Sequence, residues 1–427
     1  MPFQGFEGPA GSGKTHRLME AVEQRLQNHP LLPHQKILSL TFMHGSRRRL
    51  DAEFKARPIL NGKAVAMTID SFAVQVWNRW RTLAASLGAQ IGDFNQTCDA
   101  CGNLLEHDAV AKWVARSYPV VMVDEAQELA LPRLRMISAL SGHSAVFVAA
   151  DEFQCLDEGV DTAPFMAWFG AGEITQLNQI HRTNQAGLLA AGVRLRGLSS
   201  PQEGAGLLIR HEFPNLAPFK IGAAIFNSQG SKAVLYPPAG GQWAQALTQR
   251  LAQGLHSPKY NIPPIFLSSE PRVDDEIELS MVALGHLEGS THTELLARID
   301  LLANSPRWMT NVRASIFGSA RRMGKMTWTD NELRDLMGRI TSNYRAYSGE
   351  RLRGVPLMPI HQAKNRQFDH VIIIWPPGVP GTAEFKARLL YNGITRARRS
   401  CKVFVRTAGL LVEPPFRFAH AQNMAQG

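Results

Sequence analysis

A group of glycines near the start of the chain, followed by a lysine, has the spacing of a loop that binds phosphate groups. The stretch EGPAGSGKTHRL begins at Glu7, and its Gly8, Gly13, Lys14 and Thr15 satisfy the pattern G-x-x-x-x-G-K-[ST]. Glycines let backbone N–H groups turn toward phosphate oxygens, and a helix that starts near Lys14 directs its positive end at them. We expect Lys14 to reach the β- and γ-phosphates and Thr15 to bind Mg²⁺. The predicted nucleotide-binding loop comprises Gly8, Gly11, Ser12, Gly13, Lys14 and Thr15.

A pair of acidic residues supplies the second half of such a site. In the stretch VVMVDEAQE, Asp124 and Glu125 directly follow four apolar residues. Asp124 is suited to hold Mg²⁺, and Glu125 is suited to orient and deprotonate an attacking water molecule. Acidic residues also cap the ends of strands, but the phosphate loop upstream favours the catalytic interpretation.

Short apolar runs that alternate with helix-compatible segments predict the fold class. The runs lie at 36–42, 63–68, 119–125, 144–151, 206–210, 232–236, 264–269, 370–375 and 401–406. Runs of this length and composition are typical of strands buried on both faces of a parallel sheet. Helices are expected between them, for instance at 16–27 and 71–87. The alternation predicts a doubly wound α/β protein with two sheets, divided near residues 175–200.

Composition narrows the class of protein. The 427 residues carry 46 Lys+Arg against 36 Asp+Glu, a net charge of +10. This surplus favours an anionic partner such as nucleic acid, although a soluble basic protein without such a partner fits the charge alone. Four cysteines form no disulfide framework, which indicates a reducing compartment. With neither a signal segment nor an apolar run of about 18 residues, we expect a cytoplasmic protein.

At this point the chain resembles the UvrD/Rep-type helicases of superfamily 1. Five further segments occur in that family's order and are similar to its motifs. They are DEAQE (124–128), AADEFQCL (149–156), LNQIHRTN (177–184), IHQAKNRQFDHVII (360–373) and RLLYNGITRARR (388–399). The matches extend from residue 5 to about residue 406, so the resemblance covers both predicted domains.

The resemblance implies two RecA-like doubly wound parallel-sheet domains with a nucleotide cleft between them. Domain 1 would span residues 1–175, with a small insertion at about 81–117. Domain 2 would span 176–412 with a reduced insertion, because the stretch 186–355 must also supply its strands, and 413–427 would form a tail. ATP and Mg²⁺ are the implied cofactors.

The resemblance also implies roles for single residues of the nucleotide site. Gln154 would sense the γ-phosphate, and Arg182 and Arg396 would act as arginine fingers. His181 stands where the family has an adenine-stacking tyrosine, and Gln367 stands where it has an acidic residue that holds the ribose. Only domain closure would then complete the site, because the two arginines belong to the later domain.

Candidate nucleic-acid contacts follow from the same resemblance. Hydroxyl and backbone groups of Thr41, Thr68 and Ser71 could bind phosphates without regard to base sequence. Phe42 and Phe72 could stack on bases, although aromatic residues at such positions more often pack in the core. The segment with IHQAK adds His361.

Departures from the family leave several functions open. Only seven residues precede Gly8, so the upstream glutamine that reads adenine has no counterpart, and Asn365 replaces a glycine. The first hypothesis is a motor that moves 3′ to 5′ on single-stranded DNA, the polarity class favoured by K-x-x-Q-F. The alternative is a regulatory ATPase subunit that gates a protein partner, such as a nuclease in a phage-defence complex. A phosphate-loop kinase would not need the 360–399 segment.

A pair of cysteines raises the question of zinc. Cys98 and Cys101 have the spacing C-x-x-C, and His107 follows. One such pair is half of a zinc site, and the same residues are compatible with a loop of the small insertion.

Overall fold

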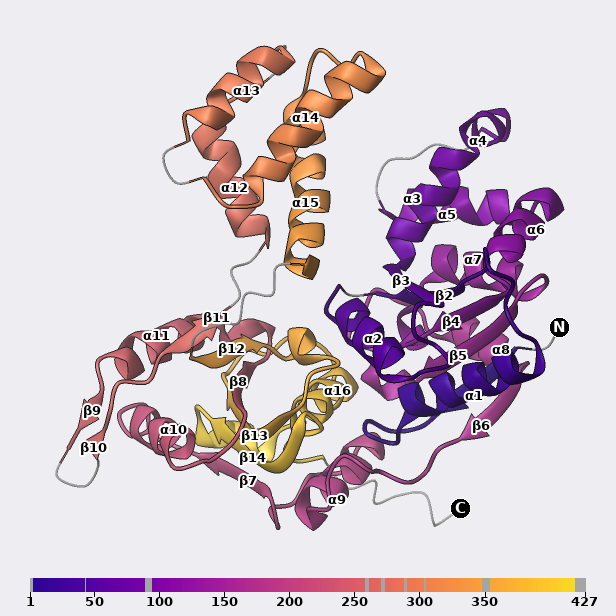
Figure 1. Cartoon of the computed structure of the whole chain (residues 1–427). Coiled ribbons are helices and arrows are strands. Elements are labelled where there is room, and N and C mark those ends of the chain that lie inside the picture. Colours follow the sequence, from indigo (N-terminus) through magenta and orange to yellow (C-terminus); the bar gives the residue numbers. More distant parts are fainter. Residues whose placement is uncertain are drawn as a thin grey trace, which may run out of the picture. The chain divides into compact units, whose positions relative to one another are not determined.

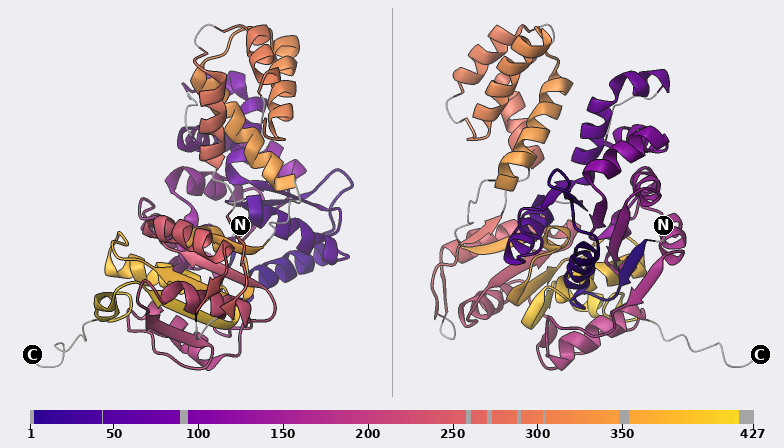
Figure 2. Two further views of the ribbon diagram at one scale, coloured as in Figure 1. Left: turned by 90° about the vertical axis from the view of Figure 1, so that its left-hand side faces the viewer. Right: turned by 45° about the vertical axis from the view of Figure 1, so that its right-hand side comes forward.

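The computed structural model describes residues 3–42, 44–88, 94–257, 261–269, 273–287, 290–302, 305–347 and 354–418. The chain divides into two compact units, one formed by residues 1–268 and 352–427 and the other by residues 269–351. The first unit contains two parallel sheets with helices around them (Figures 1 and 2).

The first sheet has the strand order β3-β2-β4-β5-β1-β6, and all its pairings are parallel. Its strands are β1 (Gln4–Glu7), β2 (Ile37–Thr41), β3 (Ala64–Thr68), β4 (Val120–Val123), β5 (Ala145–Ala150) and β6 (Glu173–Gln176). Its helices are α1 (Lys14–Asn28), α2 (His44–Ala56), α3 (Ile69–Arg79), α4 (Arg81–Ser86), α5 (Phe94–Leu105), α6 (Asp108–Ser117), α7 (Leu131–Ser141) and α8 (Ala163–Gly170), with short 3₁₀ turns at Ala126–Glu128 and Glu152–Gln154.

Successive strand residues of the first sheet point into different cores. On one face Val121 and Val123 pack with α3, α5 and α7, and on the other Val120 and Met122 pack with α1 and α2. Parallel sheets are covered on both faces, which explains why these strands are almost continuously apolar in the sequence.

The second sheet has the order β11-β12-β8-β13-β14-β7. Its pairs β12–β8, β8–β13, β13–β14 and β14–β7 are parallel. The strands are β7 (Leu207–His211), β8 (Lys232–Tyr236), β11 (Leu267–Ser269), β12 (Val355–Pro359), β13 (Phe368–Trp375) and β14 (Ala397–Val405). Helices α9 (Ala186–Arg196) and α16 (Ala383–Ile394) cover one face, and α10 (Ala217–Phe226) and α11 (Gly241–Ala252) cover the other. The remaining elements are a small hairpin of β9 (Leu255–His256) and β10 (Asn261–Ile262), and 3₁₀ turns at Pro238–Gly240, Ile360–Ala363 and Ala408–Val412.

The sheet order explains how distant motifs come together. β1 lies beside β5, and β5 lies beside β4. The residues that follow these strands are the phosphate loop, Asp151 and Asp124 respectively. Because parallel strands end at one edge of their sheet, these groups meet there, which is where ligands bind in open α/β sheets.

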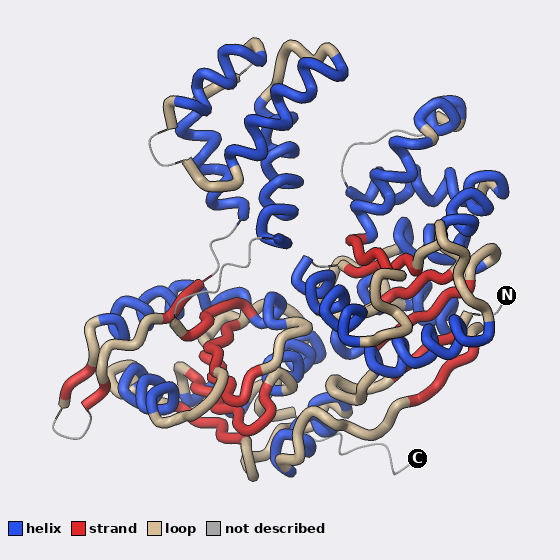
Figure 3. Tube along the Cα trace, viewed as in Figure 1, coloured by secondary structure: helices blue, strands red, loops and turns tan. Residues whose placement is uncertain are grey.

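The second unit is built from helices (Figure 3). They are α12 (Val273–Leu284), α13 (His292–Asp300), α14 (Met309–Met323) and α15 (Asp330–Tyr347). Their core includes Leu295, Val312, Ile316 and Leu333. A helical unit with its own core stands where the sequence analysis expected little room for an insertion. The reason is that the strands supplied by this stretch end at Ser269 and resume at Val355, and α12 to α15 lie between them in the sequence.

Two local predictions also differ from the structure. The helix expected at 71–87 is two helices, because α3 ends at Arg79 and α4 begins at Arg81. The DACGN segment, compatible in sequence with a loop, lies in α5, where Cys98 and Cys101 face the core. Among the described residues, no helix is long and apolar enough to cross a bilayer.

Candidate nucleotide-binding site

The phosphate loop takes a backbone path that favours glycine. Gly11 and Gly13 have φ values of 86° and 85°, in the left-handed region. A Cβ atom on Gly11 would lie 2.7 Å from the Cβ of Arg182. The backbone N–H of His181 donates a hydrogen bond to the carbonyl of Gly11 at 2.8 Å. The loop is therefore closed on one side by the segment between β6 and α9.

Lys14 lies buried at the start of α1 and points into this loop. Its Nζ donates to the carbonyl oxygens of Gly8 and Pro9 at 2.8 and 3.2 Å, and it lies 3.8 Å from Oδ2 of Asp151. Burial lowers the pKa of Lys14, and the charge of Asp151 opposes that shift. A phosphate would stabilise this buried ammonium group more strongly than the two carbonyl oxygens do, because a phosphate carries a full negative charge.

Thr15 and Asp124 form a pair of oxygen ligands at the end of β4. The Thr15 hydroxyl donates to Oδ2 of Asp124 at 3.0 Å. Burial, followed by the neighbouring charge of Glu125, raises the pKa of Asp124 to about 6. Because a hydroxyl and a carboxylate are the hard oxygen ligands that Mg²⁺ prefers, these residues fit the predicted metal site.

Glu125 has an unusual backbone conformation for a residue other than glycine. Its φ is 60°, and its N–H donates to Oδ1 of Asp124 at 3.1 Å. Its Oε2 accepts a hydrogen bond from Gln127 Nε2 at 2.6 Å, while Gln127 Oε1 accepts from the backbone of Asp151 at 3.0 Å. Left-handed backbone at a residue of this type costs energy and is concentrated at functional sites. It favours the predicted role of Glu125 as the base.

Arg396 is almost fully buried and belongs to the second sheet's side of the site. Its Nη2 donates to Oε1 of Gln154 at 3.1 Å, and its Nε donates to the carbonyl of Asn392 at 3.0 Å. Burial lowers the pKa of Arg396. Gln154 and Arg396 are 242 positions apart in the sequence, and both were expected in the nucleotide site. The structure brings their side chains into contact.

Arg182 is the second guanidinium group near Lys14. Its Nη1 donates to the carbonyl of Thr395 at 2.7 Å. Burial, and then the nearby charge of Arg396, lowers the pKa of Arg182 to about 9. Two guanidinium cations close together in a buried site repel each other, and a bound anion would offset this repulsion. The geometry at this edge of the first sheet therefore fits a bound phosphate chain.

A buried carboxylate that the sequence analysis did not single out lies at the centre of these contacts. Asp151 is fully buried, and its carboxylate accepts hydrogen bonds from Arg196 (2.5 Å), Gln154 (2.8 Å) and Tyr391 (3.4 Å). The Tyr391 hydroxyl in turn accepts from the backbone N–H of Ala10 in the phosphate loop at 2.8 Å. The available signal was an acidic residue that ends an apolar run, the same signal that identified Asp124.

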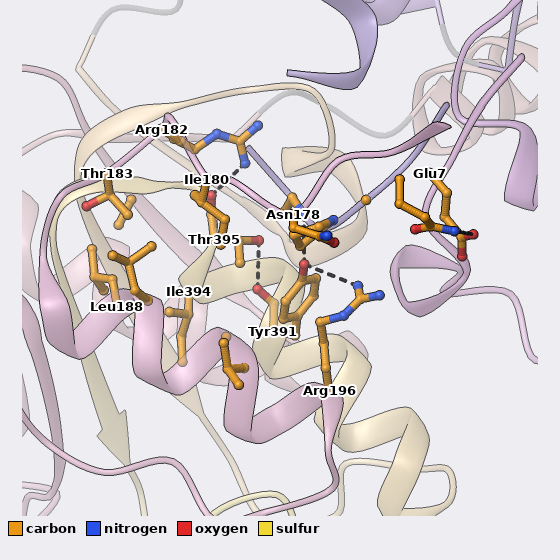
Figure 4. Close-up of a pocket in the computed structure, with 18 residues that line it drawn as sticks. Glu7, Asn178, Ile180, Arg182, Thr183, Leu188, Arg196, Tyr391, Ile394 and Thr395 are labelled. Carbon is orange, nitrogen blue, oxygen red and sulfur yellow. Dashed lines mark hydrogen bonds between the residues drawn. The ribbon is translucent and has the colours of Figure 1, made fainter. Parts of the chain in front are cut away.

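A pocket of about 310 Å³ lies between the start of the phosphate loop, α9 and α16. Its wall includes Ile180, Arg182, Leu188, Arg196 and Tyr391 (Figure 4). His181 does not line it. The His181 side chain is exposed and lies beside Gly13, where its Cδ2 would be 3.8 Å from an added Cβ. The position of His181 next to the loop is compatible with the predicted stacking on a base, which stays a prediction.

The segment that follows β12 explains one departure from the family pattern. Asn365 has a φ of 61°, and asparagine is among the few residues that adopt this conformation in place of glycine. Gln367 Oε1 accepts hydrogen bonds from Arg398 at 2.9 and 3.2 Å, so the predicted ribose contact would have to compete with that guanidinium group. Lys364 pairs with Glu128 of the first sheet's side.

The predicted nucleic-acid contacts comprise polar residues and aromatic residues. Among the polar residues, Thr41 ends β2 and is buried, and Thr68 caps α3 by accepting a hydrogen bond from the Ser71 N–H at 3.2 Å. His361 is exposed. Phe42 is partly buried against the core. Phe72 is only 2% exposed and packs in that core, so its predicted role as a stacking platform is wrong, because helix α3 turns this ring inward.

The cysteine pair has no metal-binding surroundings. Cys98 and Cys101 are buried, and the Sγ of Cys98 donates to Asp70 Oδ1 at 3.3 Å. Among the described residues, no group of three or more His, Cys, Asp or Glu side chains could hold a metal ion.

Two family models match the chain. One, described as an AAA domain, matches residues 4–160, and the other, described as the UvrD-like helicase C-terminal domain, matches residues 355–403. The first match contains the phosphate loop, Asp124, Glu125 and Gln154, and the second contains Arg396. The chain is thus similar to an AAA domain in its first part and to the C-terminal domain of UvrD-like helicases near its end, which supports the resemblance seen in the sequence.

Solved structures with some likeness include the arterivirus nonstructural protein 10 helicase. Its complex with DNA has a TM-score of 0.33 and 11% identity, covering 95% of this chain and 61% of that chain. The same protein without DNA has a TM-score of 0.32 and 11% identity, with 95% and 59% covered. This chain thus spans about three fifths of the length of those structures. No curated protein sequence matches the chain.

Replacement of Phe72 distinguishes a core residue from a stacking platform. We expect Phe72→Ala to lower the free energy of unfolding by about 3–5 kcal/mol, because it leaves a cavity between α3 and the first sheet. Phe72→Leu should retain most of the stability. Urea unfolding followed by circular dichroism measures both. An unchanged midpoint in Phe72→Ala would show that the ring is not part of the core.

The ion pair of Asp151 with Arg196 should be measurable as a coupling energy. In a double-mutant cycle of Asp151→Asn and Arg196→Gln, we expect the two losses of stability not to add, with an interaction energy of about 1–3 kcal/mol. The reason is that each single change already removes the short contact between Asp151 and Arg196, so the second change has less to remove. Additive losses, within about 0.3 kcal/mol, would mean that the contact contributes nothing.

Proposed function

We propose that this protein is an ATP-dependent motor that moves along single-stranded DNA in the 3′-to-5′ direction. The observation that carries the proposal is the hydrogen bond between Arg396 and Gln154, which joins the two sheets beside Lys14 and Glu125. Two arginines from beyond the first sheet converge on the phosphate loop, as a motor that closes on its nucleotide requires.

Each residue of the site has a defined part in hydrolysis. Lys14 binds the β- and γ-phosphates, and Glu125 orients a water molecule and takes its proton. Arg182 and Arg396 offset the charge that develops on the γ-phosphate in the transition state. Mg²⁺, held by Thr15 and Asp124 when it is bound, would neutralise charge on the phosphate oxygens.

Hydrolysis can be coupled to movement through Gln154. Its Oε1 accepts from Arg396, and its Nε2 donates to Asp151. Loss of the γ-phosphate removes the anion that draws the two arginines of the later domain toward the phosphate loop, so closure is then less favourable. A cycle of closing and opening moves the two sheets relative to each other, and this displacement is what a translocating protein applies to a strand.

The nucleic-acid path is proposed along the carboxyl ends of β2 and β3. Thr41 and Thr68 end these strands, and Ser71 lies in the first turn of α3. Hydroxyl groups and the N-terminus of α3 suit phosphate groups, which are common to all base sequences. The net charge of +10 agrees with such a partner.

Steady-state hydrolysis tests this function directly. ATP, GTP, CTP and UTP are each compared with and without single-stranded DNA or RNA, and movement is followed on oligonucleotides labelled at either the 3′ or the 5′ end. We expect ATP hydrolysis to rise several-fold with single-stranded DNA and a signal that depends on the labelled end. Hydrolysis that no oligonucleotide changes would argue against a motor. Co-purification with a protein that redirects the activity would favour a regulatory subunit.

Arg396, one of the two proposed arginine fingers, has a matched control residue in the same segment. We expect Arg396→Ala to lower kcat by about 10³-fold or more, because the transition state loses a buried guanidinium group. Arg399→Ala, three residues on, removes a side chain that is 68% exposed and pairs with Asp369, so it should leave kcat unchanged. Lys14→Ala and Glu125→Gln should abolish turnover. Equal rates for the two arginine variants would refute the assignment of Arg396.

A further inference from the structure

Helices α3, α4 and α6, labelled in Figure 1, carry a cluster of tryptophans and arginines together with the residue between α3 and α4. It consists of Trp77, Arg79, Trp80, Arg81 and Trp113, and we call it the tryptophan–arginine surface. The first four residues fall within the stretch WNRWR at the junction of α3 and α4, and Trp113 comes from α6.

The geometry leaves Trp113 open to the outside. Trp113 is 37% exposed, and its indole meets Trp80 edge-on, with ring centroids 5.9 Å apart at an interplanar angle of 81°. The Arg79 guanidinium lies 5.9 Å from the centroid of Trp113, and that of Arg81 lies 5.2 Å from the centroid of Trp77. Trp80 thus fixes the orientation of Trp113, while the ring of Trp113 stays accessible beside a cation.

The charges of this surface are not neutralised, in contrast to those of nearby helices. Arg133 pairs with Asp70, and Arg135 pairs with Glu106 and Asp99. Within the described parts of the chain, neither Arg79 nor Arg81 has a carboxylate partner, and Arg81 donates instead to the Asn78 amide oxygen at 2.6 Å. Exposed guanidinium groups without counter-ions are available for an external anion.

The surface continues the proposed nucleic-acid path. Helix α3 begins next to Thr68 and carries Ser71 in its first turn and Arg79 at its end. The rise of an α-helix, 1.5 Å per residue, places these two residues about 12 Å apart along its axis. A strand whose phosphates contact Thr68 and Ser71 would therefore need to continue for only about 12 Å along α3 to come to Arg79.

We propose that the tryptophan–arginine surface is a second binding site for single-stranded nucleic acid. Trp113 stacks on a base, and Arg79 and Arg81 bind phosphates of the same strand. This inference rests on the proposed function, since it extends the path of that strand. Stacking on an aromatic face tolerates any base, as a moving protein requires. A purely apolar partner surface would offer no anionic group to the two exposed guanidinium groups.

Binding of fluorescein-labelled oligothymidine, followed by anisotropy with the full chain and no nucleotide, tests the proposal. We expect Trp113→Ala to weaken binding about five-fold or more, and Trp113→Phe, which keeps an aromatic face, to weaken it less. In the double variant Arg79→Gln/Arg81→Gln, the slope of log K against log salt should become shallower by about 1.4, or 0.7 for each lost phosphate contact. Nucleotide hydrolysis without oligonucleotide should be unchanged in each variant.

Arg406→Gln is the matched control, because its guanidinium also lies over an indole, 5.7 Å from the centroid of Trp243, on the second sheet's side. We expect this variant to bind like the wild type. If the wild type binds and Trp113→Ala and Arg79→Gln/Arg81→Gln bind equally well with an unchanged salt slope, the inference is wrong and the surface is better suited to a protein partner. If the wild type itself does not bind the oligonucleotide, the proposed function fails first.

Discussion

The arrangement of the nucleotide site depends on one buried carboxylate. Transfer of an ion from water to a protein interior costs several kcal/mol unless partners compensate for it. Asp151 is fully buried, and its partners are Gln154 from the first sheet's side, Arg196 from α9 and Tyr391 from α16. Because α9 and α16 cover the second sheet, Asp151 keeps its contacts with Arg196 and Tyr391 only while the two sheets stay together. A single acidic residue thus links the geometry of the phosphate loop to that of the later motifs.

Arg196 also lets Lys14 change partners without a large electrostatic penalty. In this structure the Lys14 ammonium group bonds to two loop carbonyls and lies 3.8 Å from Asp151. A bound phosphate would draw Lys14 toward itself. Asp151 would then keep the Arg196 guanidinium, which is 2.5 Å away. Removal of one member of a buried pair is costly when it strands the other, and a third charged group avoids that outcome.

Much of the first unit could be predicted from the sequence, because its determinants are local. A doubly covered parallel strand needs an unbroken apolar run, so β2, β4, β5, β13 and β14 were evident, whereas the exposed β6 has no such run. The phosphate loop and Asp124 follow fixed spacings. Asp151 was missed because its importance comes from partners 45 and 240 positions away. Phe72 was misassigned because spacing alone does not tell which face of α3 meets the core.

The same electrostatic reasoning explains why the site needs an anion. Burial lowers the pKa of both Arg182 and Arg396, and the charge of Arg396 lowers the pKa of Arg182 further. Their hydrogen bonds go to neutral oxygens, those of Thr395, Asn392 and Gln154. Neutral acceptors hold a guanidinium in place but do not cancel its charge. Holding two preorganised cations in this site therefore lowers the stability of the folded protein. A phosphate chain between these cations and Lys14 would offset their charge, and its effect would be largest when its own negative charge is greatest.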